Sequence, residues 1–354
     1  MMMESLASSY KAAEQKKLLL ILAALLLTLA GAYVFTTLGM KNVSSLQLWL
    51  ALQKLSGGTL DSGSDAAVNK VIVLLRLPRV ILAILAGIGL SLAGAVMQSL
   101  TRNYLVSPFT LGISSAAAFG ASVGIVFGTG VFLQSEAGMI TCAFVSACAC
   151  GCVVYSIARY IGMSPSSLVL VGIALNYLFS AMTAAIEFFA KEHKLEAVVQ
   201  WTFGSFNRAT WESIAITAAI TLIGFVIMML YCLKLNVMAT NSDEMAQSLG
   251  VNTGRVRVIC GMLAILLTAT IISFTGVIGF VGLIAPHIAR LVIGDNHLYY
   301  LPFASVLGAL LLLCADTIGK FILYPVNIPV GIVISFLGVP LFIHLILLKR
   351  RSLA

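Results

Sequence analysis

The residues of this chain that could do chemistry are sparse, so the first question is whether any of them form an active site. No Gly-x-x-x-x-Gly-Lys-Ser/Thr phosphate loop occurs, and the nearest glycine-rich stretch, 250–256, lacks the required lysine and hydroxyl. Paired carboxylates, a nucleophile elbow and a cluster of metal ligands are also missing from the sequence. We therefore expect no catalytic site, metal site or cofactor in this chain.

The polar stretch that stands out is residues 240–257, which interrupts a chain that is otherwise almost continuously apolar. Its pattern, Glu-x-Ala-x-x-Leu-Gly from Glu244 to Gly250, predicts a short helix that Ser242 or Asp243 caps and Gly250 ends. Such a helix between two hydrophobic spans could pack into a groove on a soluble partner. Spacing alone is equally compatible with an ordinary solvated loop.

Composition indicates a membrane protein. Of the 354 residues, 60% are hydrophobic and 10% are charged, and the mean hydropathy is +1.06, far from the values of soluble domains. A span needs about 20 apolar residues to cross about 30 Å of hydrocarbon, and by that rule we expect an all-α polytopic fold of about ten spans. The predicted spans are 18–38, 72–100, 109–132, 138–160, 167–189, 212–233, 256–275, 277–293, 300–323 and 328–348.

The least regular part of this pattern is the seventh and eighth spans. Gly276, Gly279, Gly282 and Pro286 interrupt them, which predicts short or broken helices. Broken helices inside a membrane usually line a path or a cavity.

Lysine and arginine placement predicts the orientation. Basic residues precede the first span and follow the last, so the positive-inside rule puts both ends in the cytoplasm, as tails 1–17 and 349–354 around one membrane domain, 18–348. The residues then expected inside are Arg102, Arg159, Lys234, Arg255, Arg257 and Arg290. Those expected outside are Lys41, Lys54, Lys70, Arg76, Arg79, Lys191, Lys194, Arg208 and Lys320. Such a basic exterior favours an acidic protein partner, and the formal charge of +8 gives no reason to expect nucleic acid.

The second span carries small residues on one helical stripe, and tight packing is favoured over an open lumen for Gly87 and Ser91. Gln98 on the same helix needs a polar partner or water. Before the helix, Arg76 and Arg79 are interpreted from position alone as interface anchors.

Asp316 lies within the ninth span, four residues before Lys320. An unpaired charge at the bilayer centre would cost about 2.5–3.5 kcal/mol or more, and an i,i+4 pair would relieve that cost. We favour this pairing over a proton relay.

Several motifs together resemble one family over roughly residues 18 to 348. They are Arg76-Leu-Pro-Arg79, Gln98, Arg102-Asn103, LVLVG at 168–172, Trp201-x-x-Gly204-Ser205, Leu249-Gly250-Val251, GVIGFVGLIAPHIAR at 276–290, Gly294-Asp295-x-His297, Ala315-Asp316 and Ile328-Pro329-Val330-Gly331. This set resembles the FecCD family, the permease subunits of importers for iron-siderophores, haem and cobalamin.

The resemblance implies a type II ABC importer in a bacterial cytoplasmic (inner) membrane, working by alternating access. Two permeases, commonly a homodimer, would pair with two cytoplasmic ATPase subunits that hold ATP and magnesium, and an external binding protein would deliver the chelate. A siderophore is the first candidate cargo, before haem and cobalamin.

The resemblance also implies site residues. A coupling helix in the loop 240–254 would contact the ATPase through Glu244, Ala246, Leu249, Gly250 and Val251. Binding-protein docking would use Arg76, Arg79 and Lys320, and the path and its cytoplasmic gate would use Gln98, Asn103, Leu105 and Ser166 in the 164–167 turn. The sequence departs from the family pattern at Tyr104, usually proline, and at Asn327, commonly glutamate.

Two other classes compete with this interpretation. A secondary transporter or channel depends on intramembrane charges, for which Asp316 and Glu187 are weak candidates. A membrane scaffold or sensor subunit would have no transport role. The polar loop and the basic exterior argue against both.

Overall fold

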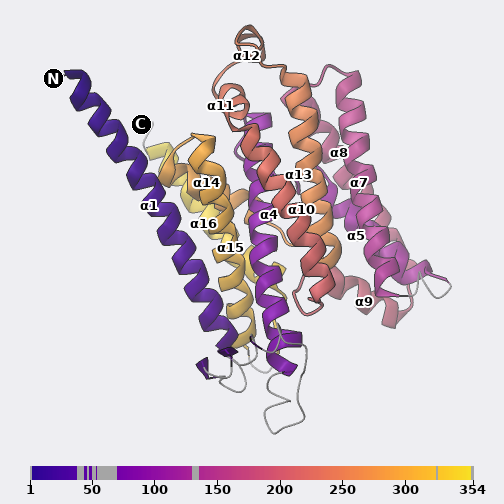
Figure 1. Ribbon diagram of the computed structural model, residues 1–354. Coiled ribbons are helices and arrows are strands. Elements are labelled where there is room, and N and C mark those ends of the chain that lie inside the picture. The colour runs from indigo at the N-terminus through magenta and orange to yellow at the C-terminus, as the bar shows by residue number, and fades with distance from the viewer. Residues whose placement is uncertain are drawn as a thin grey trace.

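The computed structural model describes residues 2–37, 44–45, 48–49, 53, 70–129, 135–323 and 326–351 (Figure 1). Lys41 and Lys54, predicted on the outer side, lie outside the described residues. Within these ranges every regular element is a helix. The helices are α1 (Met2–Thr37), the π-helix η1 (Ile72–Arg76), α4 (Leu77–Thr101), α5 (Ile113–Phe127), α7 (Glu136–Tyr160), α8 (Pro165–Phe189), α9 (Glu192–Thr202), α10 (Trp211–Leu230), α11 (Cys232–Thr240), α12 (Asp243–Ser248), α13 (Thr253–Thr275), α14 (Val281–Ile293), α15 (His297–Phe321) and α16 (Val330–Arg351).

These helices match the predicted spans. In the described part of the chain, seven helices are long and apolar enough to cross a membrane. Three shorter apolar helices, at Ile113–Phe127, Val281–Ile293 and Val330–Pro340, coincide with further predicted spans. The all-α polytopic fold is therefore confirmed, while the number of crossings and the side of the termini stay predictions.

The bundle has two distinct ends. The start of α1, the end of α16 and the short helix α12 lie together at one end, here called the α12 end (Figure 1). Helix α9 and η1 lie at the opposite end, called the α9 end. Helix α1 is continuous from Met2 through the predicted N-terminal tail into the first span, and the assignment of 1–17 to the cytoplasm stays a prediction.

Helix α4 lies at the centre of the bundle and contacts α10, α13, α14 and α15. Its small residues let neighbouring backbones approach closely: a Cβ on Gly87 would lie 2.3 Å from the Gly308 carbonyl oxygen, and one on Gly94 would lie 1.7 Å from that of Gly282. Ser91 Oγ donates to the Ala304 carbonyl oxygen at 2.6 Å. The stripe on α4 is therefore a packing surface, as predicted.

The predicted break falls between α13 and α14. Helix α13 is uninterrupted to Thr275, the chain then turns at Gly276 with φ +73°, and α14 is a 13-residue helix with Pro286 inside it. A Cβ on Gly276 would lie 2.2 Å from the Trp201 carbonyl oxygen. The seventh span is thus intact, and the irregular backbone is confined to 276–280.

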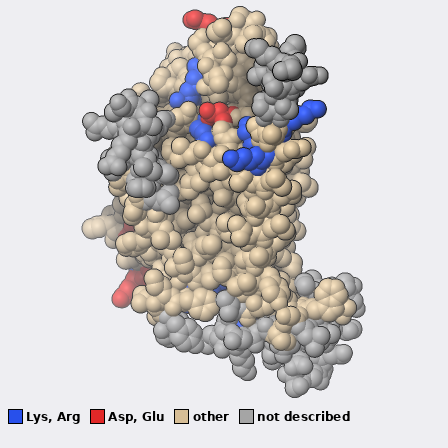
Figure 2. All heavy atoms as spheres, turned by 90° about the vertical axis from the view of Figure 1, so that its left-hand side faces the viewer, with Lys and Arg blue, Asp and Glu red and all other residues tan. Residues whose placement is uncertain are grey.

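The surface has the character that a bilayer requires. Large apolar side chains project from the outer helices, including Leu19 and Leu26 of α1, each 65% exposed. Figure 2, which views the α1 side, shows most of the visible charged side chains toward the α12 end, a few near the lower edge, and a broad uncharged area across the middle of this face. Such an area lowers the free energy of the chain in hydrocarbon and would be costly in water.

The α4–α14 contact gives a stability prediction. Gly94→Val should lower the melting temperature of the detergent-solubilised protein, because overpacking a tight contact costs about 1–3 kcal/mol. Gly254→Ala is the control, since its Cβ would meet nothing closer than Asn252 Oδ1 at 3.7 Å. Equal melting temperatures for Gly94→Val and wild type would contradict this account of the core.

Candidate functional site

The polar stretch forms the short capped helix that the sequence predicts. Ser242 Oγ accepts a hydrogen bond from the backbone N–H of Met245 at 3.2 Å and caps the start of α12. Gly250, with φ +82°, ends it, and the Val251 N–H donates to the Ala246 carbonyl oxygen at 3.0 Å. Because glycine adopts positive φ without a Cβ clash, it suits this termination.

The side chains of this segment divide into two sets. Glu244 and Leu249 are exposed, the latter by 61%, and Met245 beside them is 57% exposed. Ala246 and Val251 are buried against the rest of the chain. Of the predicted ATPase contacts, Glu244, Leu249 and Gly250 are therefore accessible to a partner, whereas Ala246 and Val251 hold α12 on the bundle.

Asp243, the first residue of α12, is bound by two arginines. Arg257 Nη1 lies 2.6 Å from Asp243 Oδ2, and Arg257 Nη2 lies 2.8 Å from Oδ1. Arg102 Nη2 also donates to Oδ1. The Arg257 side chain is 2% exposed, so its buried positive charge needs this carboxylate to offset the cost of removing it from water. The hydrogen bonds and charge of Arg257, followed by those of Arg102, hold the pKa of Asp243 below its usual value, although partial burial opposes the shift.

The same arginines reach three other segments. Arg257 Nε donates to the Leu100 carbonyl oxygen at 3.3 Å, at the end of α4, and Arg257 Nη1 donates to that of Met163 at 3.1 Å, in the turn before α8. Arg102 Nε donates to the Met238 carbonyl oxygen of α11 at 2.7 Å. We call Asp243, Arg102 and Arg257 the coupling cluster, since they join α12 to all three segments.

The predicted gate residues lie on the two turns that Arg257 joins. After α4, Asn103 Oδ1 accepts from the Leu105 N–H at 3.0 Å, and Leu105 is 52% exposed. Before α8, Ser166 Oγ lies 2.9 Å from the Oγ of Ser164, the residue that caps that helix. The structure thus brings Asn103, Leu105 and Ser166 to the α12 end.

Tyr104, where the sequence departs from the family pattern, binds the first turn to α14. The Tyr104 ring centroid is 4.5 Å from Cζ of Arg290, and the Tyr300 ring centroid is 4.6 Å from the same atom. The guanidinium of Arg290 also pairs with Asp295. Proline at 104 could not make this cation–π contact.

Gln98 lies beneath this group, fully buried. Its Oε1 accepts from the Tyr300 hydroxyl and its Nε2 donates to the Leu283 carbonyl oxygen, each at 3.4 Å. The polar partner that the sequence analysis required for Gln98 is therefore present.

At the α9 end, Asp316 binds two of the predicted docking cations. Lys320 Nζ lies 2.9 Å from Asp316 Oδ2, which confirms the predicted i,i+4 pair. Arg79 adds a second pair, with Nη2 2.8 Å from Oδ1 and Nε 3.0 Å from Oδ2. The Asp316 side chain is 5% exposed. Arg76 Nη1 donates to the Thr36 carbonyl oxygen at 3.1 Å, at the end of α1.

The sequence analysis missed the coupling cluster. It used Arg102 as a topology marker and as part of a family motif, Arg257 as a topology marker only, and Asp243 as a possible cap. Their partners lie between 14 and 157 positions away in the chain, so no local spacing indicates the cluster. The only local signal was that Arg257 is the fifth residue of α13, one turn beyond the start of the helix.

Comparisons with known proteins give matches over most of the chain. A model of the FecCD transport family matches residues 18–349. A protein of Methanocaldococcus jannaschii named as an ABC transporter permease is 42% identical, over 79% of this chain and 82% of its own. An Fe(3+)-citrate import system permease of Bacillus subtilis is 38% identical, over 82% and 86%. A hemin transport system permease of Yersinia pestis is 34% identical, over 90% and 94%.

A solved structure has the same fold. It is described as an inward-facing conformation of a metal-chelate type ABC transporter, and it superposes with a TM-score of 0.80 at 29% identity. The match covers 92% of this chain and 98% of that one. The helices around α12 thus belong to an architecture shared over nearly the full length of both chains.

The coupling cluster predicts a pH dependence. The pKa of Asp243 is lower in the folded than in the unfolded chain, so its contribution to stability is complete above the unfolded value of about 4 and is lost as pH falls through the folded pKa. We expect Asp243→Asn to melt at a lower temperature than wild type at pH 7, and the difference to shrink below about pH 4.

The matched control is Glu244→Gln, at the exposed carboxylate next in sequence. It should melt like wild type at both pH values. A melting difference for Asp243→Asn that stays constant from pH 7 to the acid range would mean that the shape of the side chain matters and its charge does not.

Proposed function

We propose that the cargo of this chain is a ferric chelate, with a siderophore as the first candidate. The chain belongs to the FecCD transport family and is a permease subunit of an ABC importer in the cytoplasmic membrane. The observation that carries this proposal is the family match over residues 18–349, which includes α12 and both gate turns. The relatives named for Fe(3+)-citrate and for hemin support a chelated iron as cargo. Haem is the second candidate, and cobalamin is the third.

The proposed assembly contains two copies of this chain, two ATPase subunits that hold ATP and magnesium, and an external binding protein. Helix α12 supports the ATPase contact, because Glu244 and Leu249 project from the α12 end. Helix α8 supports the second copy, because Leu170, Tyr177 and Phe188 are each more than 70% exposed on one largely unburied apolar helix. Such a surface suits packing within the membrane against an equivalent subunit.

In the proposed mechanism, nucleotide binding on the ATPase moves α12. The coupling cluster carries that motion to the end of α4 and to the turn before α8, since Arg257 is bonded to Asp243, Leu100 and Met163. Asn103, Leu105 and Ser166 would then open or close the path at the α12 end. Hydrogen-bond and ion-pair networks, together with rigid helices, are the elements that carry energetic coupling between separate segments of a protein.

Docking of the binding protein is proposed for the cations Arg76, Arg79 and Lys320. Asp316 neutralises one charge of the three, so the group stays positive toward an acidic partner. Arg79 and Lys320 are held in place by this internal pairing, which lowers the entropy lost when a partner binds.

The competing classes have less support among the described residues. A proton-driven transporter would need a carboxylate free to change its protonation state inside the membrane. Asp316 instead accepts hydrogen bonds from Arg79 and pairs with Lys320, which is the arrangement of a structural ion pair. A scaffold without transport would make no use of the bonded connection between α12 and the gate turns.

Reconstitution tests the function. The permease, its ATPase and its binding protein in liposomes should accumulate an iron-55 siderophore only when ATP reaches the ATPase. Glu244→Lys and Leu249→Asp should each abolish uptake and chelate-stimulated ATP hydrolysis, because they reverse charge or place charge on the exposed face of α12. Glu14→Lys, a charge reversal on α1, is the control and should transport normally.

Two results would contradict the proposal. Uptake driven by an ion gradient without ATP would indicate a secondary transporter. Normal coupling in both α12 variants would remove α12 from the ATPase contact.

Docking gives a separate prediction. Arg76→Glu should weaken binding of the loaded binding protein to the permease, and wild-type binding should weaken steeply as salt rises. A single exposed pair is worth about 0.2–1 kcal/mol, so the change in affinity should be modest and the change in association rate larger. Arg76 is chosen because Arg79→Glu would also face Asp316 and disturb the fold.

Surface plasmon resonance at increasing salt measures both quantities. Lys191→Gln, which removes an exposed cation at the same end, is the control. Salt-independent binding, or an unchanged association rate for Arg76→Glu, would leave Arg76 with no role beyond its bond to the end of α1.

A further inference from the structure

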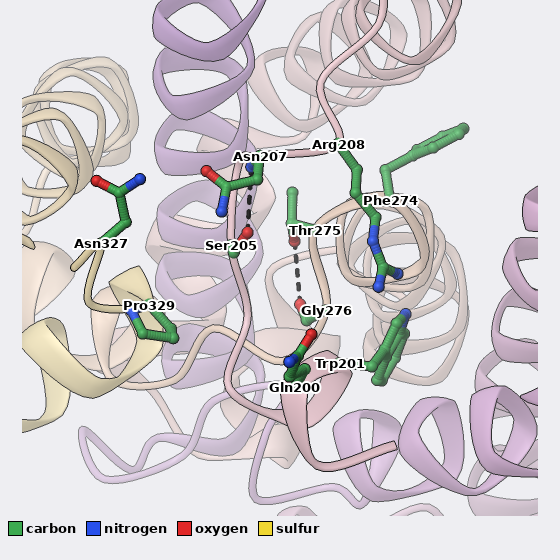
Figure 3. A pocket seen from close by; sticks show the side chains of 10 residues that line it. All are labelled: Gln200, Trp201, Ser205, Asn207, Arg208, Phe274, Thr275, Gly276, Asn327 and Pro329. Carbon is green, nitrogen blue, oxygen red and sulfur yellow. Dashed lines mark hydrogen bonds between the residues drawn. The ribbon is translucent and has the colours of Figure 1, made fainter. Parts of the chain in front are cut away.

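A polar cavity opens at the α9 end, outside the residues assigned above to docking, coupling and gating. Its volume is about 380 Å³, within the range of about 300–1,000 Å³ typical of small-molecule sites. It lies between the end of α9, the α9–α10 connection, the end of α13 and the segment before α16 (Figure 3). Its lining residues are Gln200, Trp201, Ser205, Asn207, Arg208, Phe274, Thr275, Gly276, Asn327 and Pro329.

The backbone beneath the cavity is rigidly built. The Ser205 N–H donates to the Thr275 carbonyl oxygen at 2.7 Å, which joins the α9–α10 connection to α13. Gly204 and Gly276 both have positive φ, and a Cβ on Gly204 would lie 2.3 Å from the Val277 carbonyl oxygen. The cavity is therefore a preformed feature of the fold, because its wall depends on two glycines in close contact.

Arg208 is the one charged residue among the described lining residues. In Figure 3 its side chain passes Phe274 and turns its guanidinium toward Trp201. Arg208 Nη1 donates to the Met139 sulfur at 3.6 Å, a weak acceptor, and no described carboxylate pairs with it. Arg79 and Arg257, by contrast, each bind an aspartate. Arg208 thus keeps donors for an anion that enters the cavity.

The neutral lining groups suit the same ligand. Asn207 Oδ1 accepts from Arg79 Nη1, which leaves the Asn207 amide nitrogen as a donor on the cavity side. Asn327 adds a second amide, and Trp201, Phe274 and Pro329 supply apolar walls. Carboxylate oxygens would find donors here, while a cationic ligand would meet Arg208.

The position of the cavity links it to docking. Through Arg79, Asn207 adjoins the Asp316 pair that holds two of the proposed docking cations. A chelate released from a binding protein docked on those cations would reach this cavity at the start of its path.

We propose that this cavity is an entry subsite for the carboxylate-bearing edge of an anionic ferric chelate, and that Arg208 is the residue that recognises its charge. The proposal rests on the proposed function and narrows its cargo to anionic, oxygen-rich chelates. A charge-assisted hydrogen bond from arginine to a carboxylate is stronger than one between neutral groups, so Arg208 contributes most of the preference.

Equilibrium dialysis of the full-length permease in lipid nanodiscs tests the subsite without the binding protein. The probes are iron-55 ferric citrate, which is anionic, and an uncharged iron-55 trihydroxamate. Wild type should bind ferric citrate more tightly than the neutral chelate. Arg208→Gln should lower the affinity for ferric citrate by about ten-fold or more and leave the affinity for the neutral chelate unchanged. Arg208→Lys should retain part of the preference.

Two further variants sharpen the test. Asn327→Glu places a carboxylate in the lining and should also lower the affinity for ferric citrate. Lys191→Gln removes an exposed cation at the same end but outside the lining, and should bind like wild type. A melting temperature close to that of wild type for Arg208→Gln shows that the variant is folded.

Several outcomes would overturn the subsite. They are no binding of ferric citrate by wild type, equal binding of the two chelates, and an unchanged affinity in Arg208→Gln. The liposome experiment separates this failure from failure of the proposed function. If ATP-driven uptake of a ferric chelate persists, only the subsite is wrong, whereas loss of all chelate uptake overturns the function.

Discussion

The structure at the α12 end depends on compensating one buried charge. The Arg257 guanidinium is almost fully removed from solvent, and an arginine cannot lose its proton to escape the cost of burial. Asp243 supplies the compensating charge, and the Leu100 and Met163 carbonyl oxygens accept further hydrogen bonds. Displacing any of these segments alone would leave N–H donors of the buried Arg257 guanidinium without partners. Helix α12, the end of α4 and the turn before α8 are therefore constrained to move together.

At the α9 end the buried charge is negative and the groups that compensate it are positive. Asp316 is the buried charge there, and Arg79 and Lys320 surround it. Arg79 also reaches Asn207, so the ion pairs and the polar cavity form one continuous group. Between the two ends, α4 packs against α14 and α15 through contacts that leave no room for a Cβ at Gly87 or Gly94. This close packing gives the bundle a stiff central axis.

Family resemblance and chain-specific detail contribute differently to function. The family match covers the elements that every part of the proposed mechanism uses. Tyr104, where the sequence departs from the family pattern, contacts Arg290 and attaches the turn carrying Asn103 and Leu105 to α14. Asn327 likewise gives the cavity an amide where a glutamate is common, which leaves Arg208 without a competing negative charge there. The two departures therefore change contacts beside the proposed gate and the proposed entry of the path, while the fold is kept.

The sequence by itself determined the membrane class, the helix positions, the break after Gly276 and the short helix at Asp243–Ser248, because these follow from local hydropathy, glycine and capping residues. It also indicated the Asp316–Lys320 pair, because the two residues have i,i+4 spacing on a single helix. Only the tertiary structure decided that Arg79 joins that pair, that Arg257 binds Asp243 and two distant carbonyl groups, and that Arg208 faces a cavity. These contacts join residues far apart in the chain, and their partners are selected by helix packing, which no local pattern encodes.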